Sequence, residues 1–337
     1  MCSSELTIKR GTPVLKVEYD PRLNYASPTK GIVDKNYIKH FTESGRYESV
    51  YLYTQLSKED VFKGKLISLT DDTFFCITYN QKLVRMTLKR AWLEYQRTKV
   101  YWMNWSNRTL IFTKYNEEIT RSSLLLKLLT YDKSGAVIAA PTTSLPETIG
   151  ETRNWDYRFC WIRDSSMVIK TFLQLGHTNS AKKFQRFLLS VNQGKQEDIQ
   201  IMYGLRGEKN LEEKILPHLK GYMESPPVRI GNGAYSQKQN DIYGVLIDAI
   251  YLSFHKFPST LDTSEELWTF VRSIVAVVAK QWDKPDKGIW EIRGADHHFI
   301  YSKAMSWVAI DRGVKIARML DRDFYVDEWS ALADKIK

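Results

Sequence analysis

The chain has 337 residues, of which 43% are hydrophobic and 26% are charged, a composition typical of a folded globular protein. It excludes wholesale disorder, a collagen-like repeat and a coiled-coil rod, and the length favours about two domains. The net charge of +10 comes from lysines that are scattered singly, so we expect no nucleic-acid partner. No run approaches about 18 consecutive apolar residues, which predicts that no segment spans a membrane.

The cysteines and the first residues bear on the cellular compartment. Cys2, Cys76 and Cys160 form no CxxC pair and predict neither a disulfide framework nor a zinc ribbon. The opening MCSSELTIKRG lacks the apolar core of a secretory signal. Together these features favour a cytoplasmic protein. The sequence also lacks the HExxH, GxSxG and Gly-rich phosphate-loop motifs.

Residues 1 to about 113 are expected to form a β-sandwich domain. Short segments rich in β-formers, such as Val50–Thr54, Lys65–Leu69 and Phe74–Thr78, are separated by Thr, Ser, Asn, Asp and Gly. This pattern favours a sandwich over βαβ units. The aromatic-rich stretch Leu88–Trp105 breaks the pattern and predicts a helix that leads to the next domain.

From about Asn116 the sequence predicts a helical domain. Apolar side chains recur at helical spacing in the segments 118–131, 164–175, 180–191, 241–255, 264–282, 303–320 and 327–337. Gly176 is expected to cap the helix that ends at Leu175. Long connections rich in glycine and aromatic residues alternate with these helices. Loops held on a rigid scaffold are where binding and catalytic residues concentrate, so we expect the functional residues in these connections.

The first informative connection runs from residue 139 to 164 and ends in NWDYRFCWIRD. Tryptophan and tyrosine rings offer an apolar face and a polar edge to sugars, and the chain holds 10 Trp and 19 Tyr. Arg163 offers a rigid fork of donors and Asp164 offers acceptors, a pair that suits neighbouring sugar hydroxyls. The alternative, equally open from spacing alone, is that Asp164 caps the helix and Arg163 forms a salt bridge.

The second connection contains GIWEIRG, in which Glu291 lies between Trp290 and Ile292. A carboxyl group held among apolar side chains has a raised pKa, because its charged form loses solvation. Such a group can protonate the leaving oxygen in glycoside hydrolysis. The alternative is an ordinary surface glutamate paired with Arg293, and the dipeptide alone favours that alternative.

The third connection runs from SPPVRIGNG to the Gln239-Asn240-Asp241 sequence that opens a predicted helix. Amides and an acid at this point suit a pocket lined for hydroxyl groups. Asp241 as a simple helix cap is the alternative and is equally open.

Taken together, these motifs resemble glycoside hydrolase family 15, the glucoamylase and trehalase family. The similar run covers about residues 121–320 and includes LKLLTYDKSGAVIAAPTTSLPE, RNWDYRFCWIRD, IMYGLRGEKNLEE, SPPVRIGN, GIWEIRG and HFIYSKAMSWVAIDRG. The resemblance implies a mainly α fold, in which a β-sandwich and a linker helix precede an (α/α)6 toroid of helical hairpins. It also implies inverting hydrolysis of terminal α-glucosyl bonds in an α-glucan, a malto-oligosaccharide or trehalose, without a metal or organic cofactor.

The resemblance also assigns roles to residues. The general acid of the family corresponds to Glu291. The floor of the glucose site corresponds to Trp161, Arg163 and Asp164, with Tyr157 stacking nearby. The substrate-binding residues that we expect are therefore Tyr157, Trp161, Arg163, Asp164, Trp290 and Asp241.

The sequence departs from the family at its ends. An inverting enzyme needs a second carboxylate, about 6.5–9.5 Å from the acid, to activate water, and in the family this base lies late in the barrel. The chain ends at Lys337, soon after the sixth or seventh predicted helix, and PVLKVEYDPRLNYA resembles the middle of the sandwich. We therefore expect an internal fragment, with a partial sandwich over 1–113 and the N-terminal part of the barrel over 114–337. A second chain that completes the barrel is one way to cover the exposed helix faces.

Several functions follow from these expectations. The first is the acid-bearing part of an inverting exo-acting α-glucosidase, of the glucan 1,4-α-glucosidase or α,α-trehalase type. Ile292 stands where fungal glucoamylases have a second acid, which leaves trehalase-like use open. The alternatives are a non-catalytic glucan-binding fragment or remnant of a split gene, and an inverting phosphorylase, in which phosphate replaces the base.

Overall fold

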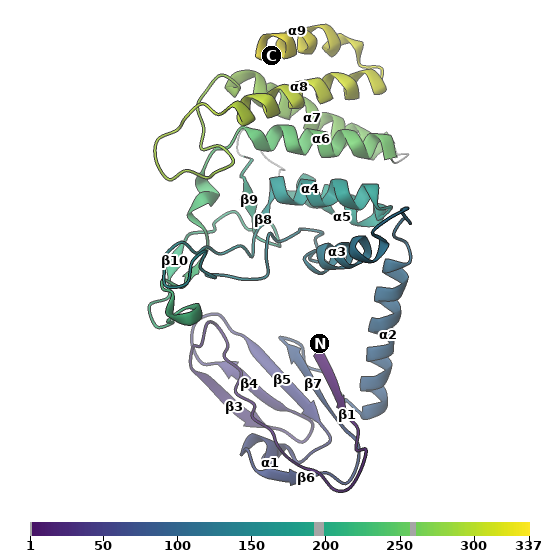
Figure 1. The fold of residues 1–337 in the computed structure, drawn as a ribbon, viewed down its shortest axis with the longest axis vertical. Helices are drawn as coiled ribbons and strands as arrows, with labels where there is room; N and C mark the ends of the chain where they lie inside the picture. The colour runs from purple at the N-terminus through teal and green to yellow at the C-terminus, as the bar shows by residue number, and fades with distance from the viewer. Residues whose placement is uncertain (1, 192–198, 257–260) are drawn as a thin grey trace. The chain divides into compact units, whose positions relative to one another are not determined.

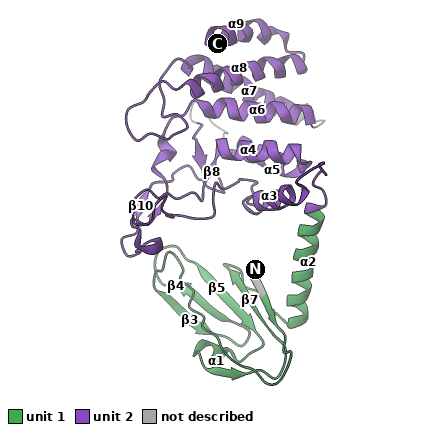
Figure 2. Ribbon diagram, in the orientation of Figure 1, with its two compact units in different colours: residues 1–105 green, residues 106–337 purple. Residues whose placement is uncertain are grey.

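The computed structural model of this chain describes residues 2–191, 199–256 and 261–337, and the contacts among them divide the chain into two compact units. Residues 1–105 form the first unit and residues 106–337 form the second (Figure 2). Helix α2 (Leu88–Ser106), which the sequence predicted, belongs almost entirely to the first unit. All of the predicted site residues belong to the second unit.

The first unit contains a five-stranded antiparallel sheet and a smaller two-stranded sheet (Figure 1). The predicted strands at 50–54, 65–69 and 74–78 are confirmed, whereas a sandwich of the two sheets stays a prediction. All six residues of β5, the strand at the centre of the large sheet, are buried, with Tyr51 and Tyr53 in one core cluster and Leu52 in another. In spatial order the large sheet has β1 (Cys2–Leu6), β7 (Thr73–Tyr79), β5 (Ser49–Thr54), β4 (Ile38–Thr42) and β3 (Thr29–Val33), and the small sheet has β2 (Val14–Lys16) and β6 (Leu66–Ser68).

One of the two core clusters in the described part of the first unit is rich in aromatic side chains. Tyr37, Tyr51, Tyr53 and Phe74 are buried in one cluster on this sheet. The Tyr53 hydroxyl accepts a hydrogen bond of 2.7 Å from the backbone N–H of Leu83, so its polar end is satisfied within the core. The short helix α1 (Lys58–Phe62) completes this unit.

The second unit is mainly helical, and each helix that the sequence predicted there is confirmed to within a few residues at either end. The glycine predicted to end one of them, Gly176, has a φ of +88°, which glycine adopts without strain, and it follows the capping residue Leu175. None of the helices in the described ranges is both long enough and apolar enough to cross a membrane. The helices are α3 (Asn116–Leu128), α4 (Ile162–Gln174), α5 (Thr178–Val191), α6 (Asp241–Lys256), α7 (Leu261–Gln281), α8 (Ile300–Met319) and α9 (Val326–Ile336).

Alternate helices of the second unit pack side by side. Helix α4 packs on α6 and α6 packs on α8, while α5 contacts α4, and α7 and α9 contact α8 (Figure 1). Helices α6 and α8 lie close together at Gly244, where an added Cβ would lie 2.1 Å from the carbonyl oxygen of Met305. Figure 1 shows the N-terminal ends of α4, α6 and α8 on one side of the unit, beside the long connections that precede them. The three connections singled out from the sequence therefore meet at that side.

Two buried aspartates join the connections to one another and to the helices. Asp156 accepts a hydrogen bond of 3.2 Å from the backbone N–H of Gly231. Asp286 accepts hydrogen bonds from the backbone N–H of Asn240 at 2.6 Å and from the hydroxyl of Ser302 at 2.8 Å. The regular elements within the connections and near the end of the chain are β8 (Cys160–Trp161), β9 (Met202–Tyr203), β10 (Lys214–Ile215), β11 (Arg229–Ile230), η2 (Tyr222–Glu224), η3 (Gly233–Ser236) and η4 (Asp323–Tyr325).

Candidate active site

A cavity of about 520 Å³ lies where the connections before α4, α6 and α8 meet, and its volume is typical of a small-molecule site. Every predicted site residue except Asp241 lines it. The complete lining is Ala139, Glu147, Arg153, Trp155, Tyr157, Trp161, Arg163, Asp164, Asn232, Ala234, Ile289, Trp290, Glu291, Ile292 and Arg293.

Glu291 is held in this cavity through both its side chain and its backbone. Its Oε1 accepts a hydrogen bond of 2.8 Å from the Nε1–H of Trp161 and lies 3.7 Å from Nη2 of Arg163. Its backbone carbonyl accepts a hydrogen bond of 3.2 Å from Nε2 of Gln237. The φ of Glu291 is +54°, a left-handed conformation that costs a non-glycine residue energy and that clusters at functional sites. The carboxylate therefore has a defined position at the start of α4.

Polar groups face this carboxylate, so the apolar enclosure expected from the sequence is wrong. Trp290 is 77% exposed, while the groups that reach the carboxylate are the indole N–H of Trp161 and the guanidinium of Arg163. The reason is that the nearest groups come from the start of α4, far away in the sequence, and not from the residues that flank Glu291. The pairing with Arg293 is wrong as well, because Nη2 of Arg293 lies 3.0 Å from Oε2 of Glu213.

A short strand and a helix start place the aromatic and charged residues before α4. Strand β8 pairs with β9, and the N–H of Ile162 donates a 2.9 Å hydrogen bond to the carbonyl of Ile201 as the helix begins. Asp164 lies in the first turn and is not the capping residue, so that alternative is wrong. The salt-bridge alternative is confirmed, because Nη2 of Arg163 lies 3.3 Å from Oδ2 of Asp164.

Two aromatic rings form part of the cavity wall. The ring centroids of Tyr157 and Trp161 lie 6.0 Å apart at an angle of 43°. Burial raises the pKa of Tyr157, and the negative charges of Glu147 and Glu291 act in the same direction, so its hydroxyl stays protonated at neutral pH. The rings thus present apolar faces together with one hydroxyl donor.

Arg163 connects the cavity to the start of α6. Its Nη1 donates a hydrogen bond of 3.3 Å to Oε1 of Gln239. Asp241 is fully buried at the first position of α6, and neither carboxylate oxygen has a hydrogen-bond partner in the described part of the chain. Burial raises the pKa of Asp241 to about 6, the positive charge of Arg163 opposes that shift, and the negative charges of Asp286 and Glu291 add to it. Asp241 therefore acts on Arg163 through charge and does not itself face the cavity.

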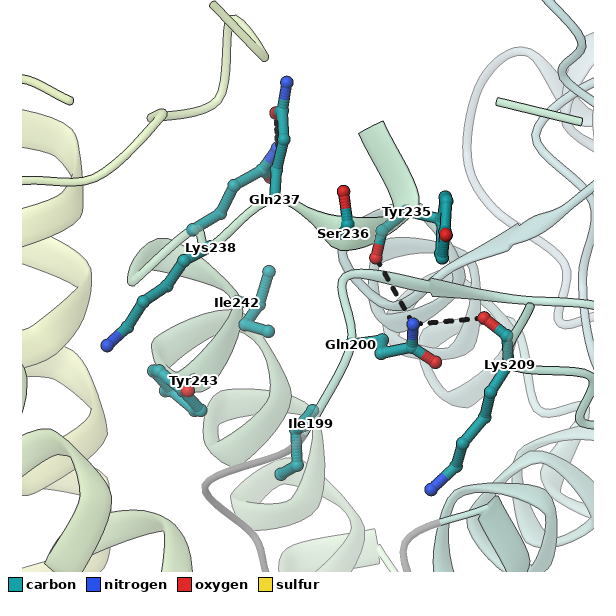
Figure 3. Close-up of a pocket in the computed structure, with 10 residues that line it drawn as sticks. Ile199, Gln200, Lys209, Tyr235, Ser236, Gln237, Lys238, Ile242 and Tyr243 are labelled. Carbon is teal, nitrogen blue, oxygen red and sulfur yellow. Dashed lines mark hydrogen bonds between the residues drawn. The ribbon is translucent and has the colours of Figure 1, made fainter. Parts of the chain in front are cut away.

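A second cavity, of about 490 Å³, is bordered by residues 235–239 and is shown in Figure 3. The side-chain amide of Gln200 donates hydrogen bonds to the carbonyl oxygens of Lys209 at 3.1 Å and Tyr235 at 3.4 Å (Figure 3). The segment that Gln200 anchors carries Gln237 and Gln239, which contact the acid and the arginine of the first cavity. The wall of the second cavity thereby supports the first.

The model of the family described as "Glycosyl hydrolases family 15" matches residues 113–337, the part of the chain that contains this cavity. The chain belongs to glycosyl hydrolases family 15. The cavity of this family 15 chain is lined by residues from four of the six segments that carry the resemblance, namely 126–147, 153–164, 225–232 and 288–294.

Curated relatives of this family 15 chain carry the name trehalase. The trehalase of Mycolicibacterium smegmatis is 41% identical over 271 residues, which cover 79% of this chain and 40% of that protein. The trehalase of Thermoplasma volcanium is 32% identical over 329 residues, covering 96% of this chain and 52% of that protein. "Trehalase 1" of Sulfolobus acidocaldarius is 43% identical over 218 residues, covering 64% and 39%. The chain spans about half of the length of these relatives or less.

The reasoning from sequence gave no site role to some residues that line the cavity of this family 15 chain. Arg293 is the main one, and Glu147 lies 3.0 Å from Arg153 on the same lining. A role for Arg293 could have been predicted from its position two residues after Glu291. A guanidinium there can reach a ligand that is bound beside the candidate acid. Among the residues that the structure describes, no three His, Cys, Asp or Glu side chains group in a way that could hold a metal ion.

Proposed function

We propose that this family 15 chain carries the acid-bearing part of an exo-acting α-glucosidase of the trehalase type. The observation that carries the proposal is the 2.8 Å hydrogen bond between Trp161 and Glu291 in a cavity that also holds Arg163 and Asp164. The name of the curated relatives favours trehalose as the substrate over a malto-oligosaccharide or another α-glucan.

Each residue of the cavity has a role in this proposal. Glu291 is the general acid, and Trp161 orients its carboxyl group while Gln237 holds its backbone carbonyl, before the substrate binds. Arg163 and Asp164 bind neighbouring hydroxyls of the terminal glucosyl ring, as donor and acceptor. The rings of Tyr157, Trp161 and Trp290 border the ring of the sugar.

The proposed reaction is hydrolysis with inversion. Glu291 gives a proton to the glycosidic oxygen as the bond from C1 to that oxygen breaks, and water attacks C1 from the opposite face. A base about 6.5–9.5 Å from the acid takes the proton of that water, and β-glucose is released. The other carboxylates of the cavity, Asp164 and Glu147, lie beside Arg163 at 3.3 Å and Arg153 at 3.0 Å. We assign the base to neither of them.

The same proposal includes the wider architecture. We propose that residues 114–337 form the N-terminal part of an (α/α)6 barrel and that residues 1–113 form a partial sandwich with its linker helix. The packing of α4 on α6 and of α6 on α8 supports this, because the inner helices of such a barrel lie side by side.

The purified 337-residue chain, incubated with trehalose or maltose, tests the proposal. Release of glucose is measured with a coupled oxidase, and binding is measured separately by ligand-observed NMR. Glu291→Gln keeps the shape of the side chain and removes the transferable proton, so hydrolysis is expected to fall at least about 100-fold with binding retained. Glu117→Gln, in the exposed first turn of α3, is the matched control.

The outcomes separate the candidate functions. Unchanged turnover in Glu291→Gln would refute its role as the acid. Binding of sugar by the wild-type chain without release of glucose would favour a non-catalytic glucan-binding role. Formation of glucose 1-phosphate only when phosphate is added would favour a phosphorylase.

A further inference from the structure

A pair of stacked arginines, separate from Arg163, lies beside the cavity. Arg293 stacks on Trp155, with its guanidinium carbon 4.1 Å from the ring centroid, and the guanidinium carbon of Arg229 lies 5.0 Å from the same centroid. Glu213 accepts hydrogen bonds from Arg229 at 2.9 Å, from Arg293 at 3.0 Å and from the backbone N–H of Gly233 at 3.2 Å. We call Trp155, Glu213, Arg229 and Arg293 the Glu213 cluster.

The members of the Glu213 cluster differ in their access to the cavity. The side chains of Glu213 and Arg229 are 17% and 14% exposed, whereas that of Arg293 is 51% exposed. Only Trp155 and Arg293 line the cavity. The hydrogen bond to Glu213 is the only one that Arg293 makes to a residue in the described part of the chain, and a guanidinium has five N–H donors. Arg293 therefore presents unused donors to the cavity from a fixed support.

Three arginines line the cavity, Arg153, Arg163 and Arg293, and their ion-pair partners differ. Arg163 lies 3.7 Å from Glu291, whereas Arg293 pairs with Glu213 instead. A general acid must lie beside the glycosidic oxygen, which in a disaccharide joins two rings. In this cavity Arg163 contacts the acid, whereas Arg153 pairs with Glu147 and Arg293 pairs with Glu213. Cationic groups both beside the acid and away from it suit a substrate with a ring on each side of the broken bond.

We propose that Arg293 binds hydroxyls of the leaving sugar and makes the site selective for a disaccharide, while Glu213 and Trp155 position its guanidinium. This inference rests on the proposed function, since it needs Glu291 beside the glycosidic bond. Trp155 serves as the support of Arg293, so its ring is not the platform for sugar stacking that its position in the sequence suggested. Long arginine side chains lose rotamer entropy when they bind, and a preformed ion pair and stacking contact reduce that loss.

Glu213 remains ionised in this arrangement. Burial acts to raise the pKa of Glu213, but the backbone N–H of Gly233 and the charges of Arg293 and Arg229 outweigh it and hold that pKa below its ordinary value. The carboxylate is therefore a constant anchor at neutral pH. Removing its charge should loosen Arg293 without removing the donors themselves.

Binding of a two-ring and a one-ring ligand tests the inference without requiring turnover. Dissociation constants for trehalose and for methyl α-glucoside are measured by ligand-observed NMR on the wild-type chain and on Arg293→Ala, Arg293→Lys and Glu213→Gln. Arg293→Ala should weaken trehalose binding about 10- to 100-fold, the range for a hydrogen bond that involves a charged group, and leave methyl α-glucoside unchanged. Arg293→Lys should lose less, because it keeps the charge but not the planar fork.

The other variants complete the design. Glu213→Gln should weaken trehalose binding less than Arg293→Ala does, again without effect on methyl α-glucoside. Arg121→Ala, at an exposed position of α3, is the matched control for loss of one arginine, and thermal unfolding midpoints report on folding. If Arg293→Ala is unfolded, the binding of trehalose and of methyl α-glucoside is compared in Arg293→Lys and Glu213→Gln instead.

Two results would count against the inference in distinguishable ways. Equal weakening of both ligands by Arg293→Ala would overturn the assignment to the leaving sugar, while the proposed function would stand. Failure of the wild-type chain to bind or hydrolyse either ligand would overturn the proposed function and the assignment with it.

Discussion

Replacing Asp241 by asparagine is expected to stabilise the chain at neutral pH. The side chain is fully buried and lacks a hydrogen-bond partner within the described residues. Burial raises the pKa of this carboxyl from 3.8 to about 6, against the pull of Arg163. Because the folded state holds the proton more tightly than the unfolded state, the stabilisation is complete below about pH 4 and is lost as the pH rises through about 6.

The size of the effect follows from the two pKa values. A pKa difference of about 2 between the folded and unfolded states corresponds to about 3 kcal/mol. Above pH 7 the ionised Asp241 therefore costs up to about 3 kcal/mol that a neutral asparagine of the same shape avoids. Well below pH 4 the two proteins should have similar free energies of unfolding, since both side chains are then neutral in the folded and unfolded states.

Urea unfolding between pH 4 and pH 8, followed by circular dichroism, checks this expectation. The free energy of unfolding of the wild-type chain should fall relative to that of Asp241→Asn as the pH rises. Asp334→Asn, at an exposed position of α9, is the matched control and should leave the pH dependence unchanged. A difference between wild type and Asp241→Asn that does not vary with pH, or a less stable Asp241→Asn at pH 7, would show that Arg163 keeps the buried carboxylate ionised.

Two further predictions concern packing and burial. Gly244→Ala places a Cβ 2.1 Å from the carbonyl oxygen of Met305 and should force α6 and α8 apart, so the free energy of unfolding is expected to fall by about 1–3 kcal/mol or more; unaltered urea unfolding would contradict the close packing. The fully buried thiol of Cys160, whose pKa burial raises to about 11, should resist alkylation by iodoacetamide in the native chain at pH 8 and react once urea unfolds it. Rapid native alkylation of its tryptic peptide, detected by mass spectrometry, would argue against that burial.

Helix positions could be predicted because their signal is local. Apolar side chains that recur with a period of 3.6 residues located α6 at Asp241–Lys256 within one residue of the predicted range 241–255. The order of the five-stranded sheet could not be predicted in the same way. Its pairing joins segments far apart in the chain, such as Cys2 with Ile77, and alternation within one strand does not select a partner.

In the cavity, too, the residues within a motif could be predicted, whereas contacts between residues far apart in the sequence could not. Sequence alone was enough to single out Glu291 and the run that contains Trp161, Arg163 and Asp164, because these residues stand in compact motifs. Only the folded chain revealed that Trp161 donates to Glu291, that Arg293 pairs with Glu213, and that Asp241 is buried away from the cavity. Contacts across 80 or 130 positions depend on how the connections meet beside α4, α6 and α8, and burial depends on the neighbours that this packing supplies.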